Sequence, residues 1–90
     1  MTEIENIQVI LYRTAELLRL AELADWARAF EKFHGEMATD PSATIGNILS
    51  LYGGMGSFND LILYRNGKLL GNENNELDAL RSQLYDMCHG

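Results

Sequence analysis

The sequence predicts a mainly helical α+β domain with three N-terminal helices, a short β-hairpin after a glycine-rich loop, and a C-terminal helix. Apolar residues recur at helical spacing through the first third of the chain. After the glycines the apolar pattern becomes short and continuous, and an Asn-Gly pair marks a turn between two apolar runs. An all-α bundle is the alternative fold. The length predicts a single domain over residues 1–90.

A start signal and an apolar stripe predict the first helix. Thr2 followed by Glu5 is a capping-box pattern, in which side chains satisfy the exposed backbone N–H groups of a helix start. One helical face is then apolar, at Ile4, Ile7, Leu11, Ala15 and Leu18. Because Glu22 falls where this stripe would continue, we expect a break near residues 20–24 that gives two helices. One long bent helix over residues 3–34 is the alternative.

The second and third helices have their own boundary signals. The second carries an apolar stripe that is more typical of a core than of a cofactor site, at Leu23, Trp26, Phe30 and Phe33. Gly35 is its predicted end. For the third helix, Asp40 is a favourable N-cap and Pro41 a favourable first residue. We expect that helix to continue to Tyr52 and to end at the Gly53-Gly54 pair.

A hairpin and a last helix are predicted for the C-terminal third. Residues 61–64 and 68–70 are short apolar runs separated by the turn signal Asn66-Gly67. Residues 71–75 are polar and are expected to form a turn, in which Asn74 or Asn75 caps the last helix. One face of that helix is apolar, at Leu77, Leu80, Leu84 and Cys88.

The most distinctive segment is YGGMGSFNDL at residues 52–61. Three glycines in four positions cost conformational entropy, so a loop of defined shape is predicted. Asn59 and Asp60 can bond to nearby backbone amides and hold such a turn. Aromatic residues beside polar and acidic ones also make good protein anchors. The candidate partner-binding residues are therefore Tyr52, Phe58, Asn59, Asp60 and Tyr64.

We predict no catalytic, metal or cofactor site. The glycine segment lacks the Lys-Ser/Thr pair of a phosphate-binding loop, and Asn59 stands where a dinucleotide motif needs its third glycine. Two groups of candidate metal ligands lack the usual spacing, namely His34, Glu36 and Asp40, and the pair Cys88-His89. We expect Ser57 to form a hydrogen bond within the loop. We expect Cys88 to pack as a small apolar residue.

The charge of the chain limits its partners. The 13 acidic and 7 basic residues give a formal net charge of -6. Nucleic acids require clustered Lys and Arg, and anionic membranes repel an acidic surface, so neither is expected as a partner. The single cysteine excludes an internal disulfide, and the sequence shows no signal peptide and no bilayer-spanning run. These features favour the cytoplasm.

The string from Tyr52 to Tyr64 resembles the signature of a small bacterial domain family of unknown function. Members are similar in pairing a helical N-terminal half, with a Trp-Ala like Trp26-Ala27, to this glycine loop and to a C-terminal helix like residues 77–87. The resemblance implies no catalytic residues, because none are established for the family. Small acidic bacterial domains of this sort also resemble immunity proteins, which neutralise a cognate toxin by binding it.

These observations predict a non-enzymatic cytoplasmic binding protein, in the form of an immunity (antitoxin-like) protein. Its partner would be a toxin whose basic active-site face is occluded by an acidic, aromatic surface. A homodimer is left open. The alternative is a small regulatory or self-associating module that binds a small ligand at the glycine loop. A third hypothesis is an enzyme that uses Ser57 or Asp60, with His34 or His89 as its base.

Overall fold

The computed structural model of the chain describes residues 2–53 and 56–89. Its elements, in chain order, are α1 (Glu3–Leu20), α2 (Ala24–Glu36), α3 (Pro41–Leu49), the 3-10 turn η1 (Phe58–Asp60), β1 (Tyr64–Arg65), β2 (Lys68–Leu69) and α4 (Gly71–His89). The predicted mainly helical α+β fold is confirmed, with three N-terminal helices, a hairpin and a C-terminal helix. Gly54 and Met55 of the glycine segment lie outside the described residues.

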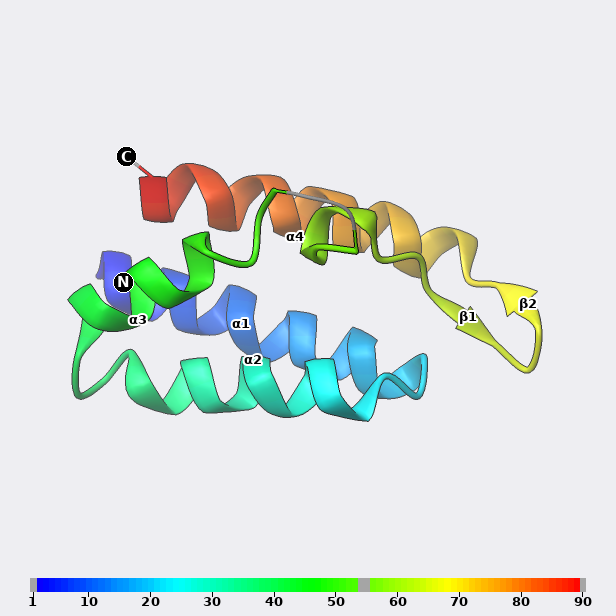
Figure 1. Cartoon of the computed structure of the whole chain (residues 1–90), viewed down its shortest axis with the longest axis horizontal. Coiled ribbons are helices and arrows are strands. Elements are labelled where there is room, and N and C mark those ends of the chain that lie inside the picture. Colours follow the sequence, from blue (N-terminus) through cyan, green and yellow to red (C-terminus); the bar gives the residue numbers. More distant parts are fainter. Residues whose placement is uncertain (1, 54–55, 90) are drawn as a thin grey trace.

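The three longer helices form a layered body, with α1 between α2 and α4 (Figure 1). The short helix α3 lies at the end of this body where both termini are found (Figure 1). The hairpin projects from the opposite end, beyond the start of α4 (Figure 1). Within the described residues, no helix combines the length and the apolar character that crossing a bilayer requires.

The first two helices are separate, as the break at residues 20–24 predicted. Glu22 adopts a left-handed conformation with φ 62°. The Leu23 amide donates to the Leu18 carbonyl at 2.9 Å, and the Glu22 amide donates to the Arg19 carbonyl at 3.0 Å. These two bonds form a Schellman motif, which closes α1 and turns the chain back along it. The predicted capping box at Thr2 and Glu5 is also present.

The core lies between the layers, and α1 contributes most to it. Its buried apolar side chains are Ile7, Ile10, Leu11, Ala15, Leu17 and Leu18. The other helices add Ala27, Phe30, Ile48, Leu77, Leu84 and Cys88. The predicted apolar stripes of α1 and α4 are buried except at two residues: Ile4 is 39% exposed and Leu80 is half-buried.

Two predicted helix ends were wrong. Gly35 does not end α2; it lies inside the helix, which runs to Glu36 and is capped at Met37. Gly53 does not end α3, because the helix stops at Leu49. The chain continues in tighter turns, in which the Leu51 amide donates to the Ile48 carbonyl and the Tyr52 amide donates to the Leu49 carbonyl. The predicted start of α3 is confirmed, since the Asp40 side chain accepts from the Ala43 amide at 3.2 Å.

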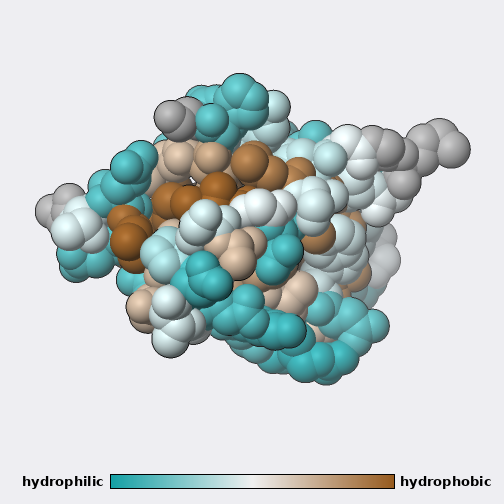
Figure 2. Space-filling model, turned by 60° about the vertical axis from the view of Figure 1, so that its left-hand side comes forward, coloured by the Kyte–Doolittle hydropathy of each residue, from teal (hydrophilic) through white to brown (hydrophobic). Residues whose placement is uncertain are grey.

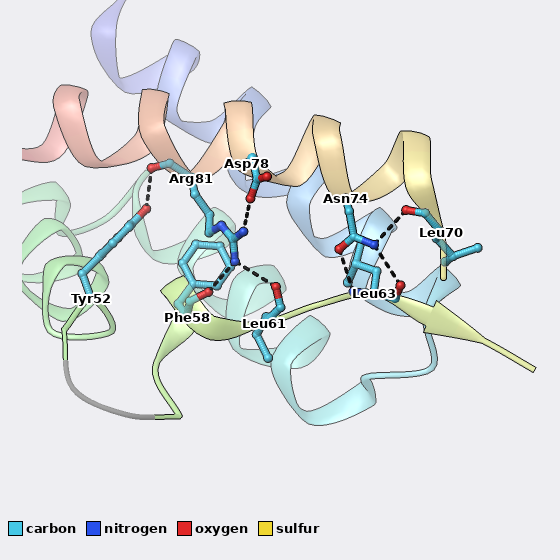
Figure 3. A network of polar contacts seen from close by, with 8 residues as sticks. All are labelled: Tyr52, Phe58, Leu61, Leu63, Leu70, Asn74, Asp78 and Arg81. Atoms are coloured by element: carbon cyan, nitrogen blue, oxygen red, sulfur yellow. Dashed lines mark hydrogen bonds and ion pairs between the residues drawn. The ribbon is translucent and has the colours of Figure 1, made fainter. Parts of the chain in front are cut away.

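The hairpin is shorter than predicted, and α4 is longer. Only Tyr64–Arg65 and Lys68–Leu69 pair as strands, around the predicted turn at Asn66-Gly67. Asn74 does not cap α4, which already begins at Gly71. Its side chain is used by the hairpin base instead: it accepts from the Leu63 amide at 2.8 Å and donates to the Leu63 and Leu70 carbonyls. The side-chain amide of Asn74 therefore satisfies both backbone groups of Leu63, as a neighbouring strand would, and it fixes the hairpin to α4 (Figure 3).

An apolar band crosses the face that is turned toward the α3 end, with hydrophilic side chains on both sides (Figure 2). On α3, Thr44 and Ile48 are buried while Ile45 and Leu49 are only half-buried. The core is therefore covered less completely at this end than along α1.

Candidate functional site

Phe58 is the centre of an aromatic cluster beneath the η1 turn. Its ring centroid lies 4.7 Å from that of Phe30, 5.5 Å from Tyr52 and 6.0 Å from Trp26. Phe58 and Phe30 are fully buried. Phe58 was predicted to bind a partner, but its side chain is part of the core and is not exposed for such a contact. The prediction that the Trp26 and Phe30 stripe packs in the core is confirmed.

Arg81 fastens the segment that follows Phe58 to α4. One guanidinium nitrogen donates to the Phe58 carbonyl at 2.9 Å and to the Leu61 carbonyl at 3.0 Å (Figure 3). The other terminal nitrogen is paired with Asp78, and the group lies 5.8 Å from the centroid of the Phe58 ring. The Arg81 side chain is only 13% exposed. Its positive charge is thus engaged within the chain and not offered to solvent.

Tyr52 joins the end of the α3 region to the second half of α4. Its hydroxyl donates to the Arg81 carbonyl at 2.9 Å (Figure 3). Its ring meets the Tyr85 ring edge-on, with the centroids 5.2 Å apart. Burial raises the pKa of the Tyr52 phenol well above its usual value, since the ionised form would be poorly solvated. Tyr52 therefore acts as a neutral hydrogen-bond donor and an aromatic wall.

Replacing Tyr52 with phenylalanine is expected to cost about 0.5–1.5 kcal/mol at neutral pH, because the bond to Arg81 is lost. The raised pKa adds a pH dependence. The unfolded wild type releases the phenol proton near pH 10 and the folded one only at higher pH, so wild-type stability falls above about pH 10. Tyr52→Phe has no such loss. In urea denaturation the stability gap between the two proteins should narrow from about pH 9 to about pH 11. A constant gap would contradict this.

An open pocket of about 410 Å³ lies between Tyr52, η1 and α4. Its lining combines aromatic, acidic and uncharged polar side chains with one arginine, namely Tyr52, Asn59, Asp78, Arg81, Ser82, Tyr85 and Asp86. Asp78, Asp86 and Tyr85 are exposed. Since Arg81 is held by backbone carbonyls and by Asp78, the lining presents carboxylates, hydroxyls and aromatic rings. We call these seven residues the α4 pocket.

The five predicted binding residues do not form one surface. Tyr52 and Asn59 both line the α4 pocket. Asp60 holds the glycine loop, because its Oδ2 accepts from the Gly56 amide at 2.9 Å, which confirms its predicted turn role. Tyr64 is half exposed on the hairpin and is not part of the pocket lining. With Phe58 in the core, two of the five residues remain at the candidate site.

The groups considered for catalysis occupy structural positions. The Ser57 hydroxyl is buried and has no hydrogen-bond partner among the described residues, so its predicted turn bond is not seen there. Cys88 is buried in the core as predicted, and burial raises the pKa of its thiol. His34 and His89 contact the rings of Tyr12 and Tyr85 respectively. In the part of the chain that the structure describes, no cluster of three or more His, Cys, Asp or Glu side chains could hold a metal ion.

A second open pocket, of about 560 Å³, lies along α1 at Glu5, Gln8, Val9, Tyr12, Arg13, Glu16 and His34. Val9 and Tyr12 are more than half exposed. This α1 pocket is lined by apolar surface more than by polar groups. Of its two carboxylates, Glu16 pairs with Arg13, which also pairs with Glu76, and Glu5 bonds to Thr2. It is the rival surface in the experiment proposed below.

Sequence reasoning missed the residues that α4 contributes to the site. Asp78, Ser82 and Tyr85 recur at spacings of three and four residues, so a helical projection places them together on one side. Only the apolar face of this helix was predicted from the sequence. The pairing of this side with Tyr52 and Asn59 is a tertiary contact, for which the sequence carries no local signal.

One comparison with known proteins found a match, and it agrees with the predicted resemblance to a domain family of unknown function. A family model described as a domain of unknown function, DUF6966, matches residues 19–71. The match includes α2, α3, the glycine segment and the hairpin, while most of α4 lies beyond it. No curated protein and no solved structure matched the chain. Because the matched segment covers more than half of its residues, the chain belongs to the DUF6966 family of domains of unknown function.

Proposed function

We propose that this domain is a non-enzymatic cytoplasmic binding protein that covers a basic surface of another protein with the α4 pocket. The observation that carries the proposal is the pocket's charge. It gathers Asp86, an exposed carboxylate with no ion pair among the described residues, and the exposed Tyr85, while the one cation in its lining, Arg81, is compensated by Asp78 and bonded to main-chain carbonyls.

The lining matches what a basic protein segment requires. Asp86 attracts Lys or Arg, and the rings of Tyr52 and Tyr85 offer faces on which a guanidinium can stack. Tyr85 is 40% exposed and rests against Tyr52, so it is pre-positioned and loses little conformational freedom on binding. Tyrosines of this kind are common anchors at protein interfaces.

The wider charge distribution supports the same kind of partner. The formal charge of -6 is spread over a small surface, so a basic partner is attracted before contact and associates faster at low salt. An immunity protein that occludes the basic active-site face of a toxin is the form of this function we propose. Its mechanism is occlusion, which requires complementary shape and charge but no reacting group in this chain.

Site-specific photo-crosslinking in the native host tests the proposal and identifies the partner in the same experiment. A photoreactive phenylalanine analogue replaces Tyr85 in the α4 pocket or, in a parallel strain, Tyr12 in the α1 pocket. Both tyrosines are exposed, at 40% and 57%, so both sites tolerate the change and both probes are accessible. Mass spectrometry then identifies the crosslinked proteins.

The expected result is a discrete adduct from position 85 with a protein that presents a basic surface, and a much weaker adduct or none from position 12. An adduct from position 12 alone would overturn the proposal in favour of the α1 face. An acidic partner at position 85 would contradict the charge argument. An adduct with a second copy of this chain would instead belong to the inference that follows.

A further inference from the structure

The two strands of the hairpin make few contacts with the helices of the described structure. It projects beyond the start of α4 (Figure 1), and Ile62, Tyr64 and Leu69 are 55%, 51% and 60% exposed. Arg65 and Lys68 lie between them in the sequence, on paired strand positions. By strand alternation Tyr64 and Leu69 share one face of the hairpin and Arg65 and Lys68 share the other, so the projecting tip offers an apolar face and a basic face, as contact surfaces do.

The charges of the chain are segregated between this hairpin and the rest. Residues 62–70 carry two basic residues and no acidic one, whereas the remainder carries 13 acidic and five basic residues. All five of those basic residues, Arg13, Arg19, Arg28, Lys32 and Arg81, form ion pairs within the chain. Neither Arg65 nor Lys68 pairs with any residue that the structure describes.

The α4 pocket has the complementary character. It presents Asp86, which has no ion pair among the described residues, and the Tyr52–Tyr85 ring pair, which suit the basic face of the hairpin. We infer that the hairpin of one copy docks into the α4 pocket of a second copy, so that the chain forms a homodimer with two equivalent contacts.

The geometry of α4 permits this pairing. The hairpin joins α4 at Leu70, immediately before its first residue, and the pocket residues of α4 span 78–86, from just before its midpoint. Two such helices, each of 19 residues and about 28 Å long, can lie antiparallel across a two-fold axis with only their N-terminal halves overlapping. Each hairpin then lies beside the other copy's pocket. Because the contact occurs twice, the symmetry doubles the buried area and closes the assembly at two copies.

A bilayer is the other surface that an exposed apolar and basic tip would suit. The rest of the chain argues against it, since a body with 13 acidic and five basic residues is repelled by anionic lipid. The same body attracts the hairpin of a second copy. The dimer and the proposed function both use the α4 pocket, but the dimer fills it with a hairpin of a second copy. A basic partner protein must therefore displace that hairpin to bind.

Sedimentation equilibrium of the whole chain tests the dimer. At about 0.05 M salt the expected mass is twice 10.1 kDa, and at about 0.5 M salt the dissociation constant should rise several-fold. Lys68→Glu and Asp86→Lys should each weaken the dimer at least about tenfold, because each places like charges at both contacts. The double variant exchanges the two charges and should restore the affinity to within about threefold.

Lys32→Glu is the matched control, because it makes the same charge change at an exposed site on α2 and should leave the dimer unchanged. Circular dichroism verifies that each variant is folded. A monomer at about 1 mM protein and low salt would overturn the inference. The inference would also fail if Lys68→Glu left the dissociation constant of the dimer unchanged, or if the double variant did not regain the wild-type affinity. Flotation with phosphatidylserine vesicles that depends on Lys68, in a monomeric chain, would assign the hairpin to a bilayer instead.

The two proposals fail independently. Lys68→Glu should weaken the dimer but leave the crosslink from position 85 to a basic partner as strong or stronger, because the hairpin then occupies the pocket less often. If the chain is monomeric and that adduct still forms, the proposed function stands and the dimer falls. If the dimer forms and no other protein is captured, the dimer stands and the proposed function falls.

Discussion

Replacing Phe58 with alanine is expected to destabilise the fold by about 3–5 kcal/mol, which is the range for truncating a fully buried phenylalanine. The ring contacts Phe30, Tyr52 and Trp26, so its removal leaves a cavity where three segments of the chain meet. Domains are stable by only about 5–15 kcal/mol, so this loss is a large share of the total. Urea denaturation measures it, with the fluorescence of Trp26, the single tryptophan, as a probe of the same cluster.

Tyr64→Ala is the matched control for Phe58→Ala. Both aromatic residues were sequence candidates for partner binding, but Tyr64 is half exposed on the hairpin while Phe58 is in the core. At high salt and a protein concentration that keeps the chain monomeric, the control should change stability by no more than about 0.5 kcal/mol, as most surface substitutions do. Similar losses for the two variants would contradict the structure of the η1 turn.

Replacing Arg81 with methionine should destabilise the fold by about 2–4 kcal/mol, because buried acceptors lose a charged donor. Methionine keeps most of the apolar volume of the arginine stem, so the loss reports the guanidinium. The Phe58 and Leu61 carbonyls would lose the bonds at 2.9 and 3.0 Å that hold them to α4. The segment that forms one wall of the α4 pocket would then be released. Denaturant midpoints measure the loss.

Arg28→Met separates this effect from the loss of an ion pair alone. Arg28 pairs with Asp25 three residues away, as Arg81 does with Asp78, but its side chain is 63% exposed and that of Asp25 92%. Exposed pairs of this kind contribute about 0–1 kcal/mol, so this variant should be nearly neutral. An Arg81→Met protein no less stable than Arg28→Met would show that the main-chain contacts of Arg81 are unimportant.

The features that the sequence predicted correctly are those encoded by neighbouring residues. The capping box at Thr2 and Glu5, the start at Asp40-Pro41 and the turn at Asn66-Gly67 each depend on residues within four positions of one another. The apolar stripes likewise follow from helical periodicity alone. Such signals establish the number and order of the elements, and hence the fold class.

The features that were missed depend on contacts between distant residues. Asn74 bonds to Leu63 across 11 positions, and Arg81 bonds to Phe58 across 23. Asn74 has the residue type of a helix cap, but its amide satisfies the base of the hairpin instead. Phe58 has the sequence context of an exposed loop, yet Arg81 holds its backbone against α4 while its ring enters the core. The composition of the loop therefore suggested a binding face where the structure has a packed one.

The proposed function depends on the local charge of the α4 pocket and not only on the net charge of the chain. Asp86 is the residue that distinguishes the two, since it is exposed in the pocket lining and the structure gives it no ion pair with any described residue. Glu22 is another exposed acidic residue, in the turn between α1 and α2, at the end of the body away from α3 (Figure 1). Lysine at either position changes the net charge by the same amount.

The crosslinking yield from position 85, measured with Asp86→Lys and with Glu22→Lys in the background, is the most direct measurement. Asp86→Lys should reduce the adduct with the basic partner about tenfold or more, and Glu22→Lys should change it less than about twofold, because only the first reverses a charge in the contact. Equal reductions would show that net charge alone governs binding. An undiminished adduct in Asp86→Lys would show that the partner does not bind through the carboxylates of the α4 pocket.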